Sequence, residues 1–280
     1  MPYDLVIQNG TIATASDVFQ ADIGIRDGVI VQIGRDLGEA VETIDATGRY
    51  VLPGGIDSHV HIAQPSGEGI VMADDFESGT RSALFGGNTT ILPFCLQEKG
   101  RPLREALKPY HALADGNCYT DVSFHLIVSD PSDAVLGQEL PALVEDGYTS
   151  FKVFMTYEDL RLSDGQILDT MDVARRTGAL VMVHCENEDA IRYLIGRHEA
   201  EGDVAPRAHA TTRPMAVERE ATHRAVSLAE VADVPLVIVH VSNRESMEEI
   251  ERARRRGRKV IGETCPQYLM LTADDLDGMD

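Results

Sequence analysis

At 280 residues and 43% hydrophobic content, the chain is long enough to bury the core of one large α/β domain or two smaller ones. Lys and Arg total 25 against 46 Asp and Glu, and the resulting net charge of -21 argues against binding nucleic acid or an anionic membrane by general electrostatics. The four cysteines are widely spaced without a CxxC pair, and neither a signal sequence nor an apolar run of ~18 residues is found, so we expect a cytoplasmic protein without disulfides that neither enters nor crosses a membrane.

Residues 1–52 are rich in β-strand signals. YDLVIQ, TIATA and ADIGIRDGVIVQIG read as short antiparallel strands, with tight turns at Asn9-Gly10 and Asp27-Gly28. The segment is too short to bury two faces by itself. We therefore expect an N-terminal β-sandwich portion that packs against another part of the chain.

Residues 53–280 alternate strands with helical stretches, which is typical of repeated βα units. Apolar runs such as LVMVH and LVIVH favour a parallel sheet covered on both faces. Helices are expected over SDGQILDTMDVARRTG and over RESMEEIERARRRG, the second capped at Ser242 or Asn243 and stopped at Gly257. Seven strands are predicted, at residues 55–61, 89–95, 121–128, 149–156, 179–184, 235–241 and 259–264.

A closed (β/α)₈ barrel of the TIM type has one more strand and helix, and about 250 residues in total. We therefore predict the α/β class, with an incomplete barrel over residues 53–280 and a small N-terminal β-sandwich part over residues 1–52.

The first barrel strand, VLPGGIDSHVH, ends in two histidines. His59 and His61 are two positions apart, so their imidazoles point to the same face of a strand, together with Asp57. Two imidazoles on one face can hold a divalent metal where further ligands converge; otherwise they are half-buried histidines satisfied by hydrogen bonds.

Three further polar residues occur at or near the carboxyl ends of predicted strands. They are Lys152 in SFKVFMTY, His184 after LVMV and His240 after LVIV. In a barrel all carboxyl ends of the strands open onto one mouth, so these side chains should converge on the first two histidines.

Lys152 lies in an otherwise apolar strand, where a charged ammonium is costly. One interpretation is an ion pair with an interior carboxylate such as Asp57. The other is carbamylation by CO₂, which would convert the cation into an anion able to bridge two metal ions. A mouth with four imidazoles and few carboxylates would need such a bridge.

These residues give the chain a resemblance to the amidohydrolase superfamily, and within it to the dihydropyrimidinase and hydantoinase group. The resemblance extends over essentially all 280 residues. It is carried by YDLVIQNGTIATA, DGVIVQIG, GGIDSHVHIAQP, DDFESGTRSALFGGNTTILPF, FKVFMTY, VMVHCEN, VIVHVSN and GETCPQYL.

The resemblance implies a site with two divalent metal ions. His59 and His61 would bind one ion, His184 and His240 the other, and Lys152, as N6-carboxylysine, would bridge them. The metal is expected to be zinc, although manganese and cobalt suit the same ligands. Tyr157 matches a family tyrosine that stabilises the oxyanion; the alternative is a tyrosine that packs on the barrel rim.

The implied reaction is hydrolysis of a cyclic amide, a dihydropyrimidine or a 5-substituted hydantoin, as in pyrimidine degradation. A hydroxide shared by the two metals attacks the ring carbonyl, and ring opening yields an N-carbamoyl amino acid. The resemblance also implies a homotetramer for the full-length form. Members of the group carry an aspartate at the end of strand eight, and this sequence has no such strand. We therefore expect that the isolated chain cannot complete the site.

Other functions also fit these motifs. Allantoinase and dihydroorotase are related cyclic amidohydrolases; dihydroorotases usually place an arginine just after HxH, where this chain has Ile62-Ala63. A noncatalytic scaffold resembling the collapsin response mediator proteins is the alternative from a different class. Such scaffolds have lost metal ligands, so metal content separates the two.

Overall fold

The computed structural model describes residues 2–66 and 69–277, and their contacts divide into two units. One unit comprises Met1–Ile56 with residues 87–90, and the other comprises Asp57–Gly86 and Ile91–Asp280. The division predicted after residue 52 stays a prediction.

The first unit contains a five-stranded sheet with the order β3-β2-β1-β4, in which β5 also pairs with β1. Its strands are β1 (Tyr3–Ala13), β2 (Val18–Arg26), β3 (Val29–Gly34), β4 (Ala40–Asp45) and β5 (Tyr50–Val51). The predicted turn between β2 and β3 is present, with φ of 52° at Asp27 and 72° at Gly28. Both residues are in the left-handed region, as a two-residue hairpin turn requires.

Two details of this unit differ from the prediction. Strand β1 runs straight through Asn9-Gly10, which forms an irregularity in the register with β2 rather than a turn. Asn tolerates the φ of 61° seen at Asn9, and that conformation serves a bulge as well as a hairpin turn. The strands predicted to be antiparallel, β1, β2 and β3, do pair in that way, whereas β4 and β5 were not predicted and pair with β1 in parallel.

The second sheet is curled and has the order β13-β12-β11-β10-β9-β7-β6, with β8 paired to β7. Every neighbouring pair from β7 to β13 is parallel. The strands are β6 (Gly55–Val60), β7 (Asn88–Leu96), β8 (Asp121–Val122), β9 (His125–Ile127), β10 (Ser150–Phe154), β11 (Leu180–His184), β12 (Leu236–Ile238) and β13 (Val260–Gly262). This curled parallel sheet matches the predicted incomplete barrel; the strand expected over residues 121–128 is divided into β8 and β9.

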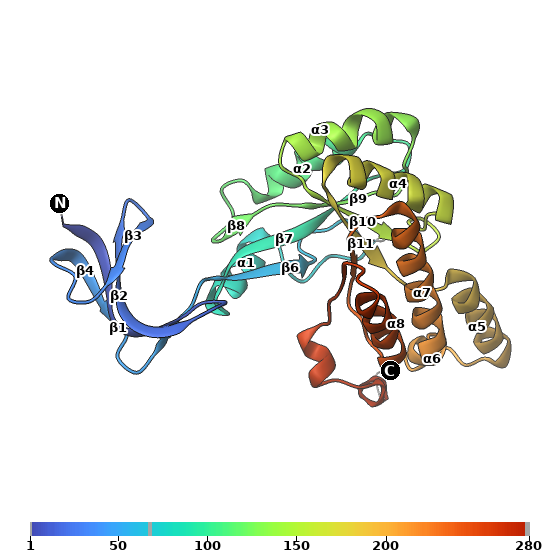
Figure 1. Cartoon of the computed structure of the whole chain (residues 1–280). Coiled ribbons are helices and arrows are strands. Elements are labelled where there is room, and N and C mark those ends of the chain that lie inside the picture. The colour runs from blue at the N-terminus through green and yellow to red at the C-terminus, as the bar shows by residue number, and fades with distance from the viewer. Residues whose placement is uncertain (1, 67–68, 278–280) are drawn as a thin grey trace. The chain divides into compact units, whose positions relative to one another are not determined.

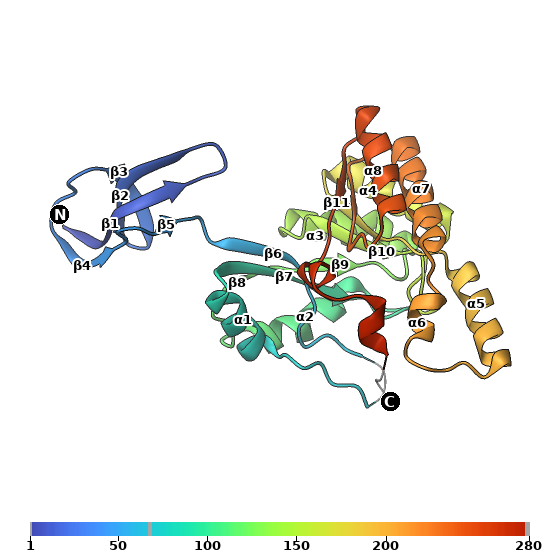
Figure 2. The ribbon, with the colours of Figure 1, turned by 90° about the horizontal axis from the view of Figure 1, so that it is seen from below.

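Helices alternate with these strands, and α4, α7 and α8 lie side by side along the sheet (Figures 1 and 2). The α-helices are α1 (Phe76–Phe85), α2 (Leu103–Ala114), α3 (Leu140–Glu145), α4 (Asp164–Thr177), α5 (Glu188–Glu201), α6 (Ala208–Thr211), α7 (Met215–Ala232) and α8 (Arg244–Arg255). A π-helical turn covers Val135–Glu139, and 3₁₀ turns cover Pro266–Leu269 and Ala273–Leu276. Asn243, rather than Ser242, caps α8.

The two faces of the curled sheet are buried in different ways. Phe151 and Val153 belong to the large cluster that packs against the helices, whereas Phe154 belongs to a smaller cluster on the opposite face. Because side chains alternate along a strand, Lys152 shares the face of Phe154. The strand period therefore directs this lysine away from the helices.

No helix in the part of the chain that the structure describes combines the length and the apolar content of a membrane span.

Candidate metal and catalytic site

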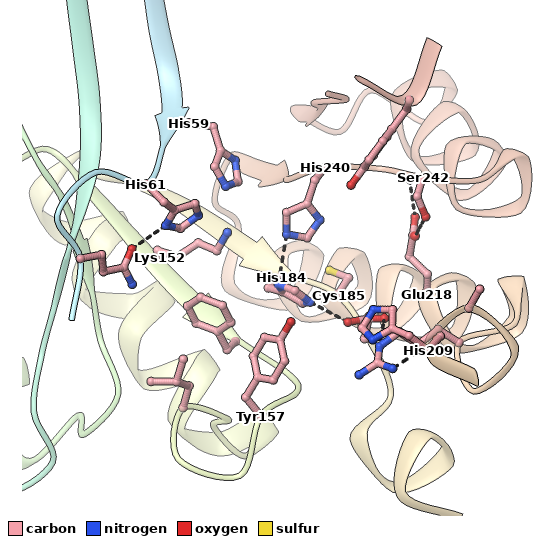
Figure 3. Close-up of a pocket in the computed structure, with 17 residues that line it drawn as sticks. His59, His61, Lys152, Tyr157, His184, Cys185, His209, Glu218, His240 and Ser242 are labelled. Carbon is pink, nitrogen blue, oxygen red and sulfur yellow. Dashed lines mark hydrogen bonds and ion pairs between the residues drawn. The ribbon is translucent and has the colours of Figure 1, made fainter. Parts of the chain in front are cut away.

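A cavity of about 540 Å³ lies at the carboxyl ends of the strands of the curled sheet (Figure 3). Strands β6, β10 and β11 contribute His59, Lys152 and His184, and the segments that follow the strands supply further lining residues. The complete lining is His59, His61, Gln64, Lys152, Phe154, Tyr157, Leu160, His184, Cys185, Glu186, His209, Ala210, Arg213, Glu218, His240, Ser242 and Tyr268.

All six residues predicted for the site line this cavity. The ring centroids of His59 lie 5.4 Å from His61 and 5.5 Å from His240, and those of His184 and His240 lie 4.4 Å apart. The Tyr157 ring stands 5.2 Å from that of His184. Residues distant in sequence thus meet because parallel strands present their carboxyl ends at one edge.

Two histidines lie just beyond the strands predicted to carry them. Strand β6 ends at Val60, one residue before His61, and β12 ends at Ile238, two residues before His240. His240 has a φ of 38°, which is incompatible with an extended strand. The strands are therefore shorter than predicted where the site begins.

Three of the four imidazoles each form a hydrogen bond, through one ring nitrogen, with a polar side chain. His59 Nδ1 contacts Glu263 Oε2 at 2.5 Å, and His61 Nδ1 contacts Gln64 Oε1 at 2.5 Å. His184 Nε2 contacts Glu186 Oε2 at 2.8 Å. Because these oxygens accept hydrogen bonds, each contacted nitrogen carries its proton, which leaves His59 Nε2, His61 Nε2 and His184 Nδ1 with a lone pair.

His184 and His240 are neutral at physiological pH. Burial, followed by the charges of nearby groups, lowers the pKa of His184 to about 3 and that of His240 to about 2. His184 Nδ1 lies 3.0 Å from His240 Nε2, and this hydrogen bond joins the two rings. Neutral imidazoles are the form that coordinates a metal ion.

Lys152 is 1% exposed and lies between aromatic rings. Its Nζ is 5.0 Å from the centroid of Phe94 and 5.1 Å from that of Phe154. Within residues 2–66 and 69–277 no carboxylate pairs with it, and Asp57 instead accepts a hydrogen bond from the backbone of His59. The suggested ion pair between Lys152 and Asp57 is therefore wrong, and burial lowers the pKa of Lys152 to about 7.

These residues fit a pair of divalent cations. Neutral imidazoles suit zinc and related ions, and an uncharged lysine amine can take up CO₂ to become an anionic ligand. In the arrangement seen here, no three His, Cys, Asp or Glu side chains of the described residues surround a common point. His184 and His240 would therefore exchange their mutual hydrogen bond for coordination.

Several residues of the site were not predicted, and the carboxylates are the most important of them. Glu186 follows β11 by two residues and Glu263 directly follows β13. Both could have been found by extending the search for polar residues a few positions past each strand. The mouth thus holds more carboxylates than expected, but Glu186 and Glu263 each accept a hydrogen bond from an imidazole.

The contact between His59 and Glu263 joins the two ends of the curled sheet. Strand β6 is at one end of the order and β13 at the other, yet residues next to them meet at the cavity. Burial is the largest single influence on Glu263 and opposes its ionisation, but the hydrogen bond and charge of His59, the His240 backbone N–H and the charge of Lys152 together lower the pKa of the carboxyl. The curl of the sheet therefore brings an ionised acceptor to the first histidine.

Two family models match this chain. The model of the amidohydrolase family matches residues 50–210, which include five of the six predicted site residues, all except His240. The model of the urease alpha-subunit N-terminal domain matches residues 1–47.

Individual relatives are similar over nearly the whole chain. D-hydantoinase of Geobacillus stearothermophilus is 50% identical over 275 residues, which are 97% of this chain and 58% of that protein. A solved structure of a D-hydantoinase superposes with a TM-score of 0.95 at 49% identity, covering 99% of this chain and 60% of that one. The dihydropyrimidinase of Brevibacillus agri gives a TM-score of 0.94 at 47% identity, covering 98% and 60%. The chain thus spans about 60% of the length of these relatives.

Proposed function

The chain belongs to the amidohydrolase family, and we propose that the protein carrying it hydrolyses a cyclic ureide or related cyclic amide to an N-carbamoyl amino acid. One observation carries the proposal: four imidazoles, a tyrosine and a buried lysine that forms no ion pair with a described residue line a single cavity at the carboxyl ends of parallel strands. Relatives named D-hydantoinase and dihydropyrimidinase support this reaction class.

The residues that would hold two divalent ions are the ones predicted from the sequence. His59 and His61 would bind one ion, His184 and His240 the other, and the carbamate of Lys152 would bridge them. Bound ions would supply an activated water and would polarise the scissile carbonyl. Zinc is our proposed metal, because imidazole and carboxylate-like oxygens are suitable ligands for it.

Lys152 can form the bridging ligand because burial outweighs the charge of Glu263 and favours the neutral amine, and no ion pair within the described residues holds it as an ammonium. With a pKa of about 7, a large part of the amine is uncharged at neutral pH. Its lone pair attacks the carbon of CO₂, the nitrogen loses one proton to solvent, and the product is an anionic carbamate. A protonated Lys152, in contrast, would repel the metal ions.

Tyr157 is suited to stabilise the charge that develops on the carbonyl oxygen. Burial raises the pKa of its hydroxyl, so the group stays protonated and remains a hydrogen-bond donor at neutral pH. Phe154 and Leu160 line the same cavity and provide an apolar surface for a substituent on the ring. The volume of about 540 Å³ is in the range of small-molecule sites.

The test is a panel of substrates with the natural gene product, isolated from its own cells and supplied with zinc. We expect opening of dihydrouracil and 5-substituted hydantoins to N-carbamoyl amino acids, and a loss of about 100-fold or more in kcat for Tyr157→Phe. Faster opening of allantoin or dihydroorotate would reassign the substrate. A protein that purifies without stoichiometric metal and opens none of these rings would contradict the proposal in favour of a noncatalytic scaffold.

We also propose a cytoplasmic homotetramer for the protein that carries this chain. Light scattering of the same preparation tests the assembly, and a monomer would contradict this part alone.

A further inference from the structure

Tyr157 has a backbone conformation that needs outside support. Its φ is 67°, in the left-handed region that a residue with a large side chain rarely adopts. The residue lies three positions after the end of β10, where the chain turns away from the strand. Strained residues of this kind persist only where surrounding contacts hold them.

Glu188, the first residue of α5, provides such contacts. Its Oε2 accepts a hydrogen bond of 2.7 Å from the Thr156 hydroxyl and one of 3.0 Å from the backbone N–H of Tyr157. Thr156 is only 1% exposed, so without Glu188 its hydroxyl would lose its acceptor in a buried position. One carboxylate oxygen therefore holds both residues at the turn.

The other contacts of this turn are local or exposed. Tyr157 O accepts hydrogen bonds of 2.8 Å from Leu160 N and 2.7 Å from Arg161 N, which close the loop on itself. Arg161 also pairs with Asp189 of α5, but the Asp189 side chain is 88% exposed, so that pair contributes little. Glu188 is thus the main link between the left-handed turn and α5.

The direction of the turn determines where the tyrosine hydroxyl points. The Tyr157 ring lies edge to face with His184 at 5.2 Å and tilted against Phe154 at 6.0 Å, and it reaches into the cavity (Figure 3). We propose that Glu188 is a positioning residue: by holding the turn at Thr156-Tyr157 it directs the Tyr157 hydroxyl toward the reacting carbonyl. The catalytic part of this inference rests on the proposed function, whereas the structural part does not.

The structural part is tested by the resonance of Tyr157 in protein labelled with 3-fluorotyrosine. The chain has eight tyrosines, and Tyr157→Phe identifies the signal that belongs to this one. In Glu188→Ala and Glu188→Asp we expect the signal to shift or broaden, because neither side chain reaches the turn. In Glu188→Gln it should stay in place, because an amide oxygen accepts the same two hydrogen bonds.

Two comparisons make this measurement specific. Glu188→Asp keeps a negative charge at the start of α5, so it separates the reach of the side chain from its effect on the helix end. Glu199→Ala removes an exposed carboxylate from the same helix and should leave the Tyr157 signal unchanged. An unchanged signal in both Glu188→Ala and Glu188→Asp would overturn the proposal.

The catalytic part is tested by kinetics with the metal-loaded protein. We expect Glu188→Ala and Glu188→Asp to lower kcat about tenfold with a smaller change in KM, and Glu188→Gln to restore most of it. In the Tyr157→Phe background the Glu188 substitutions should lower kcat little further, because both changes remove the same contribution, that of the Tyr157 hydroxyl. If the losses in kcat caused by the Glu188 and Tyr157 substitutions were fully additive, the positioning role would be overturned. If the protein were inactive but showed the expected Tyr157 signals, only the proposed hydrolysis would be overturned.

Discussion

Lys152 and His184 lie on neighbouring strands and line the same cavity, yet their surroundings are opposite. The lysine stands between Phe94 and Phe154 and has no carboxylate partner among the described residues. The histidine is bonded to Glu186, which in turn pairs with Arg213 at 3.5 Å. In a chain with 46 acidic residues, the lack of an ion pair between Lys152 and any carboxylate in the described part of the chain is the more informative feature.

The difference shows two uses of burial in one site. Around Lys152, apolar contacts make the charged form costly and favour the neutral amine, which is the reactive form. Around the histidines, partly buried carboxylates fix which ring nitrogen carries the proton and leave the other free. The site therefore combines carboxylates that bond to imidazoles with a lysine whose burial outweighs the charge of Glu263.

The largest expected effect comes from replacing Lys152 by methionine in the metal-free chain. The pKa of Lys152 falls from 10.5 to about 7, which corresponds to about 5 kcal/mol at roughly 1.4 kcal/mol per pKa unit. Below about pH 7 the amine is charged in both the folded and the unfolded state, so the folded chain bears the whole free-energy cost of burying the charge. Lys152→Met should therefore raise the free energy of unfolding at neutral and lower pH.

The pH dependence has a definite sign. Between about pH 7 and pH 10.5 only the unfolded chain binds the proton, so the stability of the unsubstituted chain should rise with pH across this window. The difference between Lys152→Met and the unsubstituted chain, measured by urea unfolding at several pH values, should shrink accordingly. Lys108→Met, at an exposed position, is the control. A constant difference would mean that Lys152 is not buried as a neutral amine.

The carboxylate side of the cavity is tested by metal affinity. Glu186→Gln and Glu263→Gln should each weaken zinc binding about 10- to 100-fold, the range seen when a partner of a metal-ligating histidine is changed. Titration calorimetry measures the affinity, and Glu199→Gln on α5 is a matched control remote from the imidazoles. Unchanged affinity in both site variants would show that the carboxylates do not orient the ligands.

A smaller effect is expected from Arg213, which pairs with Glu186 and forms no hydrogen bond with an imidazole of the described residues. Arg213→Met should destabilise the chain by about 1 kcal/mol, because Glu186 is partly buried and loses its counter-charge. Burial already raises the pKa of Glu186, with Arg213 opposing, so the substitution should raise it further.

Zinc affinity should fall only two- to threefold in Arg213→Met, roughly 0.5 kcal/mol, since the hydrogen bond between Glu186 and His184 remains. Arg255→Met removes a more exposed pair with Glu251 and serves as the comparison. A loss of affinity as large as that of Glu186→Gln would place Arg213 among the main determinants of the site.

The sequence predicted the parts of the site that follow from strand periodicity. His59, Lys152 and His184 were found because each occupies or ends an apolar strand, and parallel strands present their carboxyl ends together. Glu263 was missed because one acidic residue after a strand is an ordinary surface feature until the curl of the sheet brings it to His59. Asn9-Gly10 was misread because the same left-handed residue serves a turn or a bulge, and only the paired strand decides between them.

By itself, the sequence determined the order of strands and helices, the alternation that gives Lys152 the same face as Phe154, and the family to which the chain belongs. These depend on local spacing and on the neighbours along the chain. Only the tertiary structure decided which groups surround each site residue: that Lys152 has aromatic rings instead of Asp57, that Glu186 and Glu263 hold imidazoles, and that Glu188 supports Tyr157. The reason is physical, because burial and hydrogen bonding are properties of the three-dimensional neighbourhood, which residues far apart in sequence create together.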